Sequence, residues 1–261
     1  MVLLISAFVS PQQSEAQDLG TQMAEALQKA KVHSVLVFDF IGPNNELNAL
    51  GQDLADKFST TLQTSSSKLT VIDRADVKKL IETNRVAPDV VRNIEIAWWL
   101  ARQLKVDAFV LGNLSLANDK LEIQIGSVAT KDGKSVGGFT ASAPISEGMK
   151  ARMVPVARAL AIDSREVMAA NGTIPACVHC PSPKFSDAAV NKRVAGTVLL
   201  SVLIGLDGRA SHIEILKPVD YRLTEKAIEA VQGWTFSPGK SADGKSIEVL
   251  TPIEVTFKYY K

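Results

Sequence analysis

The clearest hydrophobic pattern in the chain lies near its carboxy end. From residue 198 onward, apolar side chains occupy alternate positions: Val198, Leu200, Val202, Ile204 and Leu206. A period of two is typical of a half-buried β-strand, because successive side chains point to opposite faces. Asp207-Gly208 follows, and Asp-Gly between two apolar runs predicts a two-residue hairpin turn. A second strand is therefore expected from Arg209 to Lys217, where Pro218 ends it.

The pattern then changes to helical spacing. Ala227, Ile228 and Val231 share one helix face; Thr224 is expected to cap this helix and Gly233 to end it. A last strand follows, with these residues on one face: Ile247, Val249, Thr251, Ile253, Val255, Phe257 and Tyr259. The carboxy-terminal third is thus predicted to be strand, turn, strand, helix, strand.

The first two thirds of the chain alternate helices with strands. Helices are expected over residues 19–31, 47–63, from 73, around 94–100, and from 147 to about 170. Strands are expected over 34–40, 69–72, 106–114, 121–128 and 135–143, with Asp132-Gly133 turning the last two. This order predicts an α/β layer domain with a mixed sheet. The fold class of the whole chain is then α+β, with a small ββαβ domain at the carboxy end.

The motifs of the last third resemble the carboxy-terminal domain of the TonB energy-transducer family. They are Gly196-x-Val198, Asp207-Gly208, the helix with Ala227 and Val231, and Trp234-x-Phe236-x-Pro238. The resemblance implies a small sheet with one helix, whose last strand is an exposed edge that binds an extended peptide of an outer-membrane protein. The residues it implies for partner binding are Ile247, Val249, Thr251, Ile253 and Phe185. Phe185-Ser186 stands where the family has Tyr-Pro, so the aromatic character is kept and the proline is lost.

A second resemblance covers roughly residues 32–125. Strand 34–40, the run from Leu69 to Ile81 and Val106-Asp-Ala-Phe-Val-Leu-Gly-Asn113 are similar to a domain shared by the FlgO family, the CsgG family and the amino-terminal part of TolB. This resemblance implies an envelope-associated assembly module without chemistry of its own. The lipid-anchoring Cys usual in the first two families is not found here.

Composition and charge narrow the classes of function. The chain has 261 residues, 46% of them hydrophobic, and a formal net charge of +1, which fits two modest domains and gives no electrostatic footprint for nucleic acid. No apolar run approaches the roughly 18 residues that a membrane-spanning helix needs. We expect an export signal over residues 1–18, domains over 19–172 and 184–261, and a stiff Pro-rich linker over 173–183.

The export signal rests on the apolar run 2–9 and on Ser14-x-Ala16, which resembles a cleavage site. The basic start of such a signal is missing, which a start codon further upstream would explain. The alternative is a frayed first helix or strand. An exported protein would be periplasmic and exposed to an oxidising environment.

The two cysteines lie in the linker as Cys177-Val-His-Cys180. In an exported protein, their number and spacing favour a disulfide that pins the start of the second domain. A redox-active dithiol is the alternative, since Cys-x-x-Cys lowers the pKa of one thiol. A zinc site would need two more ligands, of which His179 supplies at most one.

Catalytic motifs are not found in the sequence, so a non-enzymatic protein without cofactor or metal is expected. Asp39 is more simply a helix cap than a catalytic acid, and Trp98-Trp99 more simply core than a sugar-stacking platform. The first hypothesis is therefore a periplasmic adaptor that binds a protein or peptide partner. The second is a periplasmic thiol-disulfide protein using Cys177 and Cys180. A homo-oligomer is compatible with either.

Overall fold

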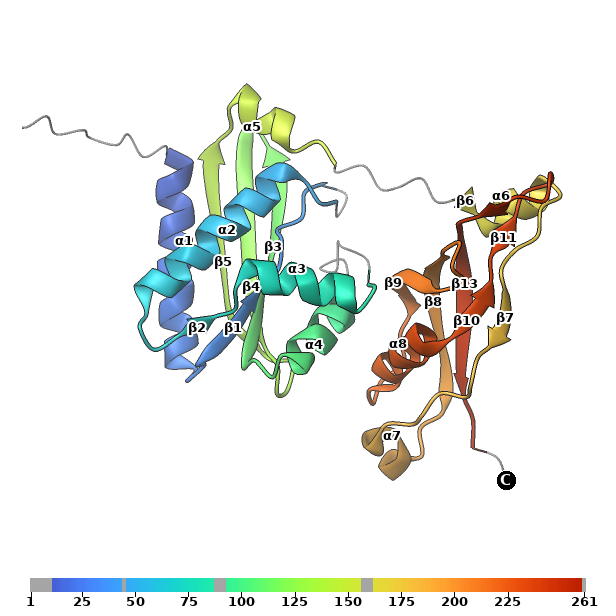
Figure 1. Ribbon diagram of the computed structural model, residues 1–261. Coiled ribbons are helices and arrows are strands. Elements are labelled where there is room, and N and C mark those ends of the chain that lie inside the picture. Colours follow the sequence, from blue (N-terminus) through green and yellow to red (C-terminus); the bar gives the residue numbers. More distant parts are fainter. Residues whose placement is uncertain (1–10, 44–45, 87–92, 156–161, 260–261) are drawn as a thin grey trace, which may run out of the picture. The chain divides into compact units, whose positions relative to one another are not determined.

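The computed structural model describes residues 11–43, 46–86, 93–155 and 162–259. The chain divides into two compact units (Figure 1). The first contains Met1–Val77 and Leu100–Val156, and the second contains Lys78–Trp99 and Ala157–Lys261. This division differs from the predicted boundary at residue 172, because residues 157–172 belong to the second unit. Of the predicted export signal, residues 1–10 lie outside the described part of the chain, and residues 11–18 are helical.

The first unit is built on a mixed sheet in the order β2-β1-β3-β4-β5 (Figure 1). Its strands are β1 (Ser34–Val37), β2 (Thr70–Val71), β3 (Ala108–Ala117), β4 (Lys120–Ala129) and β5 (Ser135–Pro144). β1 pairs in parallel with β2 and β3, whereas β3, β4 and β5 form an antiparallel meander. The structure thus confirms the predicted mixed sheet.

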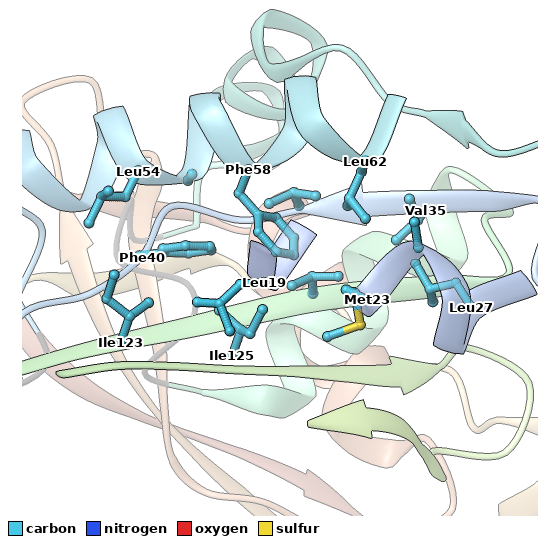
Figure 2. Close-up of a cluster of buried hydrophobic side chains, with 14 of the residues drawn as sticks. Leu19, Met23, Leu27, Val35, Phe40, Leu54, Phe58, Leu62, Ile123 and Ile125 are labelled. Carbon is cyan, nitrogen blue, oxygen red and sulfur yellow. The ribbon is translucent and has the colours of Figure 1, made fainter. Parts of the chain in front are cut away.

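Two amphipathic helices, α1 (Pro11–Lys29) and α2 (Ala49–Ser65), form the core of this unit with the sheet (Figure 2). Leu54, Phe58 and Leu62 recur every fourth residue of α2 and are buried. Met23 and Leu27 of α1 are fully buried beside them. Burial of each such side chain stabilises the fold by about 1.5–3 kcal/mol.

The end of β1 is held by a partly buried ion pair. The guanidinium of Arg74, at the start of α3 (Arg74–Thr83), contacts the carboxylate of Asp39 and donates to the carbonyl oxygen of Val37 at 2.7 Å. Its Nε lies 2.7 Å from Oδ1 of Asp56 on α2. Asp39 is therefore an ion-pair partner of Arg74, and the helix-cap interpretation was wrong. The cap of α2 is Asn48, whose side chain accepts from the N–H of Gly51.

The second unit contains a smaller sheet in the order β6-β13-β8-β9 (Figure 1). Its strands are β6 (Ile162–Asp163), β8 (Gly196–Ile204), β9 (Ala210–Lys217) and β13 (Val249–Phe257). Helix α8 (Leu223–Gly233) lies against β8 and β9, with Ala227, Ile228 and Val231 fully buried. The predicted order of strand, turn, strand, helix, strand is confirmed.

Several local predictions were wrong. The helix expected from 147 to about 170 is interrupted: α5 (Glu147–Arg152) and α6 (Ser164–Ala169) are separate, and β6 precedes α6. The segment expected to be a linker contains β7 (Ala176–His179), which pairs with β10 (Thr235–Ser237). Thr224 does not cap α8; its hydroxyl bonds both backbone groups of Val219, in the preceding turn.

The remaining elements are short. β11 (Gly239–Lys240) pairs with β12 (Ser246–Ile247), and α7 (Asp187–Lys192) precedes β8. α4 (Ile94–Gln103), like α3, crosses the division between the units. Of the tryptophan pair on α4, Trp99 is 2% exposed and Trp98 is partly buried, which agrees with the core-packing interpretation for Trp99.

Candidate functional site: the outer edge of the last strand

β13 is fully paired on one side. It runs antiparallel to β8 in an uninterrupted register from Val249 opposite Ile204 to Phe257 opposite Gly196. On its other side, β6 pairs in parallel with Val249 and Leu250 alone. Within the described residues, the side of β13 that faces away from β8 therefore has no strand partner from Thr251 to Phe257. We call this stretch the outer edge.

Pro252 indicates which backbone groups face the outer edge. It lies opposite Ser201 within the unbroken register with β8. A proline has no N–H, so a sheet accommodates it where its nitrogen faces away from the neighbouring strand. Alternate residues of an antiparallel strand turn their backbone groups to the same side. The N–H and C=O groups of Glu254 and Thr256 therefore also face the outer edge.

The side chains of β13 distinguish its two faces. Val255 and Phe257 are 0% and 1% exposed and belong to the core, whereas Thr251 and Ile253 on the same face are partly buried. On the opposite face Pro252 and Glu254 are exposed. An additional strand at this edge would thus place one set of side chains beside Ile253 and the other beside Glu254.

An aromatic cluster follows the end of β13. The ring of Phe185 makes an edge contact with Phe257, with 5.4 Å between centroids, and stacks on Tyr259 at 4.6 Å. The hydroxyl of Tyr259 donates to the carbonyl oxygen of Ala189 at 3.0 Å. Phe185, predicted as a partner-binding residue, therefore holds the segment before β8 against the end of the last strand.

The structure gives the other predicted partner-binding residues different surroundings. Ile247 lies in β12 opposite Gly239, and Val249 has strand partners on both sides. Thr251 and Ile253 lie on the outer edge. Glu254 and Thr256 were not among the predicted partner-binding residues, although the position of Pro252 in the alternating pattern indicates which backbone groups face away from β8.

The hairpin between β8 and β9 brings together two sequence motifs, Asp207-Gly208 and Trp234-x-Phe236-x-Pro238. Its loop spans residues 205–209 and is longer than the predicted two-residue turn. Gly208 has φ +70°, and a Cβ there would lie 2.1 Å from the carbonyl oxygen of Phe236. The N–H of Phe236 in turn donates to the carbonyl oxygen of Gly208 at 2.9 Å. Gly208 is needed both for the turn and for this close approach to β10.

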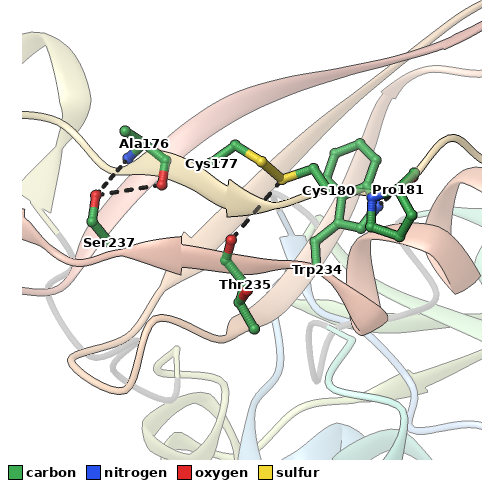
Figure 3. The surroundings of a disulfide bond; sticks show 7 residues. All are labelled: Ala176, Cys177, Cys180, Pro181, Trp234, Thr235 and Ser237. Carbon is green, nitrogen blue, oxygen red and sulfur yellow. Dashed lines mark hydrogen bonds between the residues drawn. A yellow bond between two sulfur atoms is a disulfide. The ribbon is translucent and has the colours of Figure 1, made fainter.

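Cys177 and Cys180 form a disulfide at the end of β7 (Figure 3). Ala176 exchanges hydrogen bonds with the hydroxyl of Ser237, and the indole N–H of Trp234 donates to the carbonyl oxygen of Pro181 at 3.0 Å. Sγ of Cys180 lies 4.0 Å from the carbonyl oxygen of Thr235; a disulfide sulfur has no proton to donate, so this is a packing contact. The predicted disulfide is thus present, and β7 is held against β10 on both sides of it.

The carboxylate of Asp163 lies in β6, the strand that pairs with the beginning of β13. Asp163 accepts hydrogen bonds from the side chain and the N–H of Arg165, and these bonds lower the pKa of the Asp163 carboxyl.

In the described part of the chain, no cluster of three or more His, Cys, Asp or Glu residues could hold a metal ion. No helix there has both the length and the apolar character needed to cross a membrane.

One comparison matches a family to a stretch within the second unit, which contains a small sheet with one principal helix. Residues 181–259 match the family described as the Gram-negative bacterial TonB protein C-terminal. These residues thus form a TonB carboxy-terminal domain, as the sequence motifs predicted. Protein tonB2 of Pseudomonas aeruginosa is 32% identical over 82 residues, which cover 31% of this chain and 30% of that protein. The chain therefore spans less than a third of this relative.

Two solved structures are among those found to be similar to this chain. The LpoB C-terminal domain from Salmonella enterica has a TM-score of 0.40 and 17% identity, covering 50% of this chain and 96% of that one. The solution structure of the Pseudomonas aeruginosa TonB CTD has a TM-score of 0.28 and 24% identity, covering 33% of this chain and 88% of that one. The resemblance of residues 32–125 to the FlgO, CsgG and TolB families stays a prediction.

Proposed function

We propose that this protein is a non-catalytic adaptor of the bacterial cell envelope, which binds an extended segment of a partner protein along the outer edge of β13. The observation that carries the proposal is that, among the residues the structure describes, no strand pairs with the outer edge from Thr251 to Phe257. An incoming strand would satisfy the backbone groups of Glu254 and Thr256, and its alternate side chains would contact the two faces of the sheet. The TonB family match supports an envelope location and a periplasmic or outer-membrane partner.

The proposal narrows the partner-binding set. Ile247 and Val249 already have partners within the chain, so we place the binding stretch at Thr251, Ile253 and the residues up to Phe257. Phe185 contributes indirectly, because its ring packs on Phe257 and Tyr259 at the end of this stretch. Strand addition depends mainly on backbone bonds, so the partner segment is defined more by its extended form than by one side chain.

The test uses short peptides selected from a displayed library against the full chain. A bound peptide is then resynthesised with N-methyl groups at alternate positions. Strand addition predicts that methylation of one alternate set abolishes binding and that methylation of the other set leaves it unchanged, because only one set donates to β13. Glu254→Pro should abolish binding as well, since it removes an outward donor. Binding that survives methylation of both sets would contradict the proposal.

The disulfide does not favour the thiol-disulfide alternative. Redox-active Cys-x-x-Cys pairs of the thioredoxin-like kind open a helix, whereas Cys177 lies within strand β7. The backbone and side-chain bonds around the disulfide connect β7 to β10 and Pro181 to Trp234. We therefore assign it a structural role.

A further inference from the structure

One end of the sheet in the second unit, where β9 and β13 end and β8 begins, is formed by three segments of the chain. The strand register places Phe257 opposite Gly196 and Lys217 opposite Leu199. The segments are residues 184–197, which include α7, residues 216–225 and residues 256–259. Because of its charge, we call this region the basic end.

Helix α7 connects the other two segments of the basic end, and it lies at the lower end of this unit in Figure 1. The hydroxyl of its N-cap residue Ser186 donates to the carbonyl oxygen of Tyr221. The hydroxyl of Tyr259 donates to the carbonyl oxygen of Ala189 at 3.0 Å. Residues that are distant in sequence are therefore neighbours at this end of the sheet.

The basic end carries an excess of positive charge. Its three segments contain six basic and three acidic residues, whereas the whole chain has a formal net charge of only +1. All six basic side chains are exposed, and in the described part of the chain only Arg222 among them forms an ion pair, with Glu225. The remainder of the sequence is therefore net negative. The basic residues are Lys184, Lys192, Arg193, Lys217, Arg222 and Lys258.

Exposed apolar and aromatic side chains lie among these charges. Val190 of α7 is 49% exposed, Tyr221 is 45% exposed and Tyr259 is 46% exposed. Tyrosine is enriched at the boundary between water and lipid, because its ring is largely apolar and its hydroxyl is polar. A soluble polyanion would use the cations alone, whereas a lipid surface would use the cations and the apolar groups together.

We propose that the basic end binds the surface of an anionic phospholipid membrane. The lipid phosphates would attract the lysines and arginines, and Val190, Tyr221 and Tyr259 would contact the headgroups and the upper part of the acyl chains. Because this attraction extends over about one Debye length, the binding is reversible and weakens as the salt concentration rises. The membrane would then lie next to the end of β13. This inference does not rest on the proposed function.

The experiment measures sedimentation of the full chain with vesicles. The wild type is expected to bind vesicles that contain phosphatidylglycerol and not vesicles of phosphatidylcholine alone. Each Lys or Arg near an anionic surface contributes about fivefold to the partition coefficient, so Lys192→Glu/Lys217→Glu should lower binding by about 25-fold or more.

The matched control for this variant is Arg209→Glu/Lys240→Glu, which changes the net charge equally. Both residues are exposed. Arg209 follows β8 in the hairpin loop, and Lys240 follows Gly239, where a Cβ would lie 2.3 Å from Val249, at the opposite end of the sheet. This control should therefore retain binding.

A second variant separates a lipid surface from a soluble polyanion. Val190→Ser/Tyr221→Asn keeps every cation, so it should weaken binding to vesicles and leave binding to polyglutamate unchanged. Asparagine tolerates the positive φ of +60° at this position. Leu206→Ser, an exposed apolar residue near the hairpin loop, is the control and should bind vesicles as the wild type does. Thermal unfolding of each variant verifies that it is folded.

Three results would overturn the inference: wild-type binding that does not depend on phosphatidylglycerol, an equal loss in the two charge-reversal variants, or full vesicle binding by Val190→Ser/Tyr221→Asn. The last result would indicate a soluble acidic partner in place of a membrane. A chain that binds vesicles but no peptide would contradict the proposed function alone. A chain that binds a peptide but no vesicles would contradict this inference alone.

Discussion

β5, the last strand of the first sheet, and β13, which is open along most of one side in the second sheet, are built differently. β5 has no charged side chain, contains two adjacent glycines and has helix α1 packed against it. A Cβ on Gly137 would lie only 3.1 Å from Cβ of Ala26, which shows how closely the helix approaches. β13 carries Glu254 on its exposed face and is followed by Lys258. β5 is thus packed against a neighbouring helix, whereas β13 has charged side chains beside its open side, which can discriminate among incoming strands.

The largest effect is expected where β13 contributes to the core. Phe257→Ala should lower the free energy of unfolding by about 3–5 kcal/mol, because the side chain is fully buried. The matched change on the other edge, Phe139→Ala, should cost about half as much, since Phe139 is only partly buried. Urea denaturation followed by circular dichroism measures both. Equal losses would mean that the two edges contribute alike to their cores.

Removal of the disulfide should affect the second unit alone. The double variant Cys177→Ser/Cys180→Ser is expected to lose about 2 kcal/mol, the value for closing so short a loop. Thermal unfolding of the oxidised protein, the variant and the reduced wild type measures this loss, and the last two should agree. If the wild type instead reduced insulin catalytically in the presence of a dithiol, the structural role assigned to this disulfide would be wrong.

A smaller effect on stability is expected from the charges beside the outer edge. Glu254→Val/Lys258→Val should change the free energy of unfolding by no more than about 0.5 kcal/mol per site, because both side chains are exposed. Concentrated solutions of this variant should become turbid, since an uncharged edge pairs without selecting a register. Thr140→Val, an exposed position on β5, should leave the solution clear. Turbidity of both variants would show that charge does not distinguish the two edges.

The smallest effect concerns pH. The pKa of Asp163 is lowered in the folded protein by the bonds from Arg165, so its contribution to stability is present above the unfolded pKa of about 3.9 and is lost as pH falls through the folded value. Asp163→Asn should therefore flatten the loss of stability below about pH 4 and change little at neutral pH. Unfolding midpoints measured across this range provide the comparison. An unchanged acid profile would exclude Asp163 as a contributor.

The sequence predicted the elements that have a strong local pattern. The helix expected over 47–63 is found as Ala49–Ser65, and the alternation of Val198 to Ile204 is found as β8. The TonB motifs also predicted the domain. They include Gly208, whose positive φ and close approach to the carbonyl oxygen of Phe236 few other residues would allow.

Elements that depend on distant partners were not predictable. β6 has two residues, too few to show a period, and it exists because it pairs with Val249 and Leu250 almost ninety positions later. β7 lies in a Pro-rich segment that has the composition of a linker. It is a strand because it pairs with β10, more than fifty positions later in the chain. At the candidate site, the sequence indicated the last strand correctly. It could not show that β6 occupies the beginning of that strand and leaves the rest open.

The pairing of β6 also determines how the second unit would respond to mechanical load. Because β6 runs parallel to β13, a pull applied at its amino-terminal side, against an anchor at the far end of β13, acts along both strands and shears their bonds together. In the described part of the chain β6 pairs with β13 over two residues and β8 over nine, so the pairing of β6 should separate before the register between β13 and β8. A pulling force on the chain before β6 would thereby extend the outer edge to include Val249 and Leu250 without unfolding the rest of the sheet.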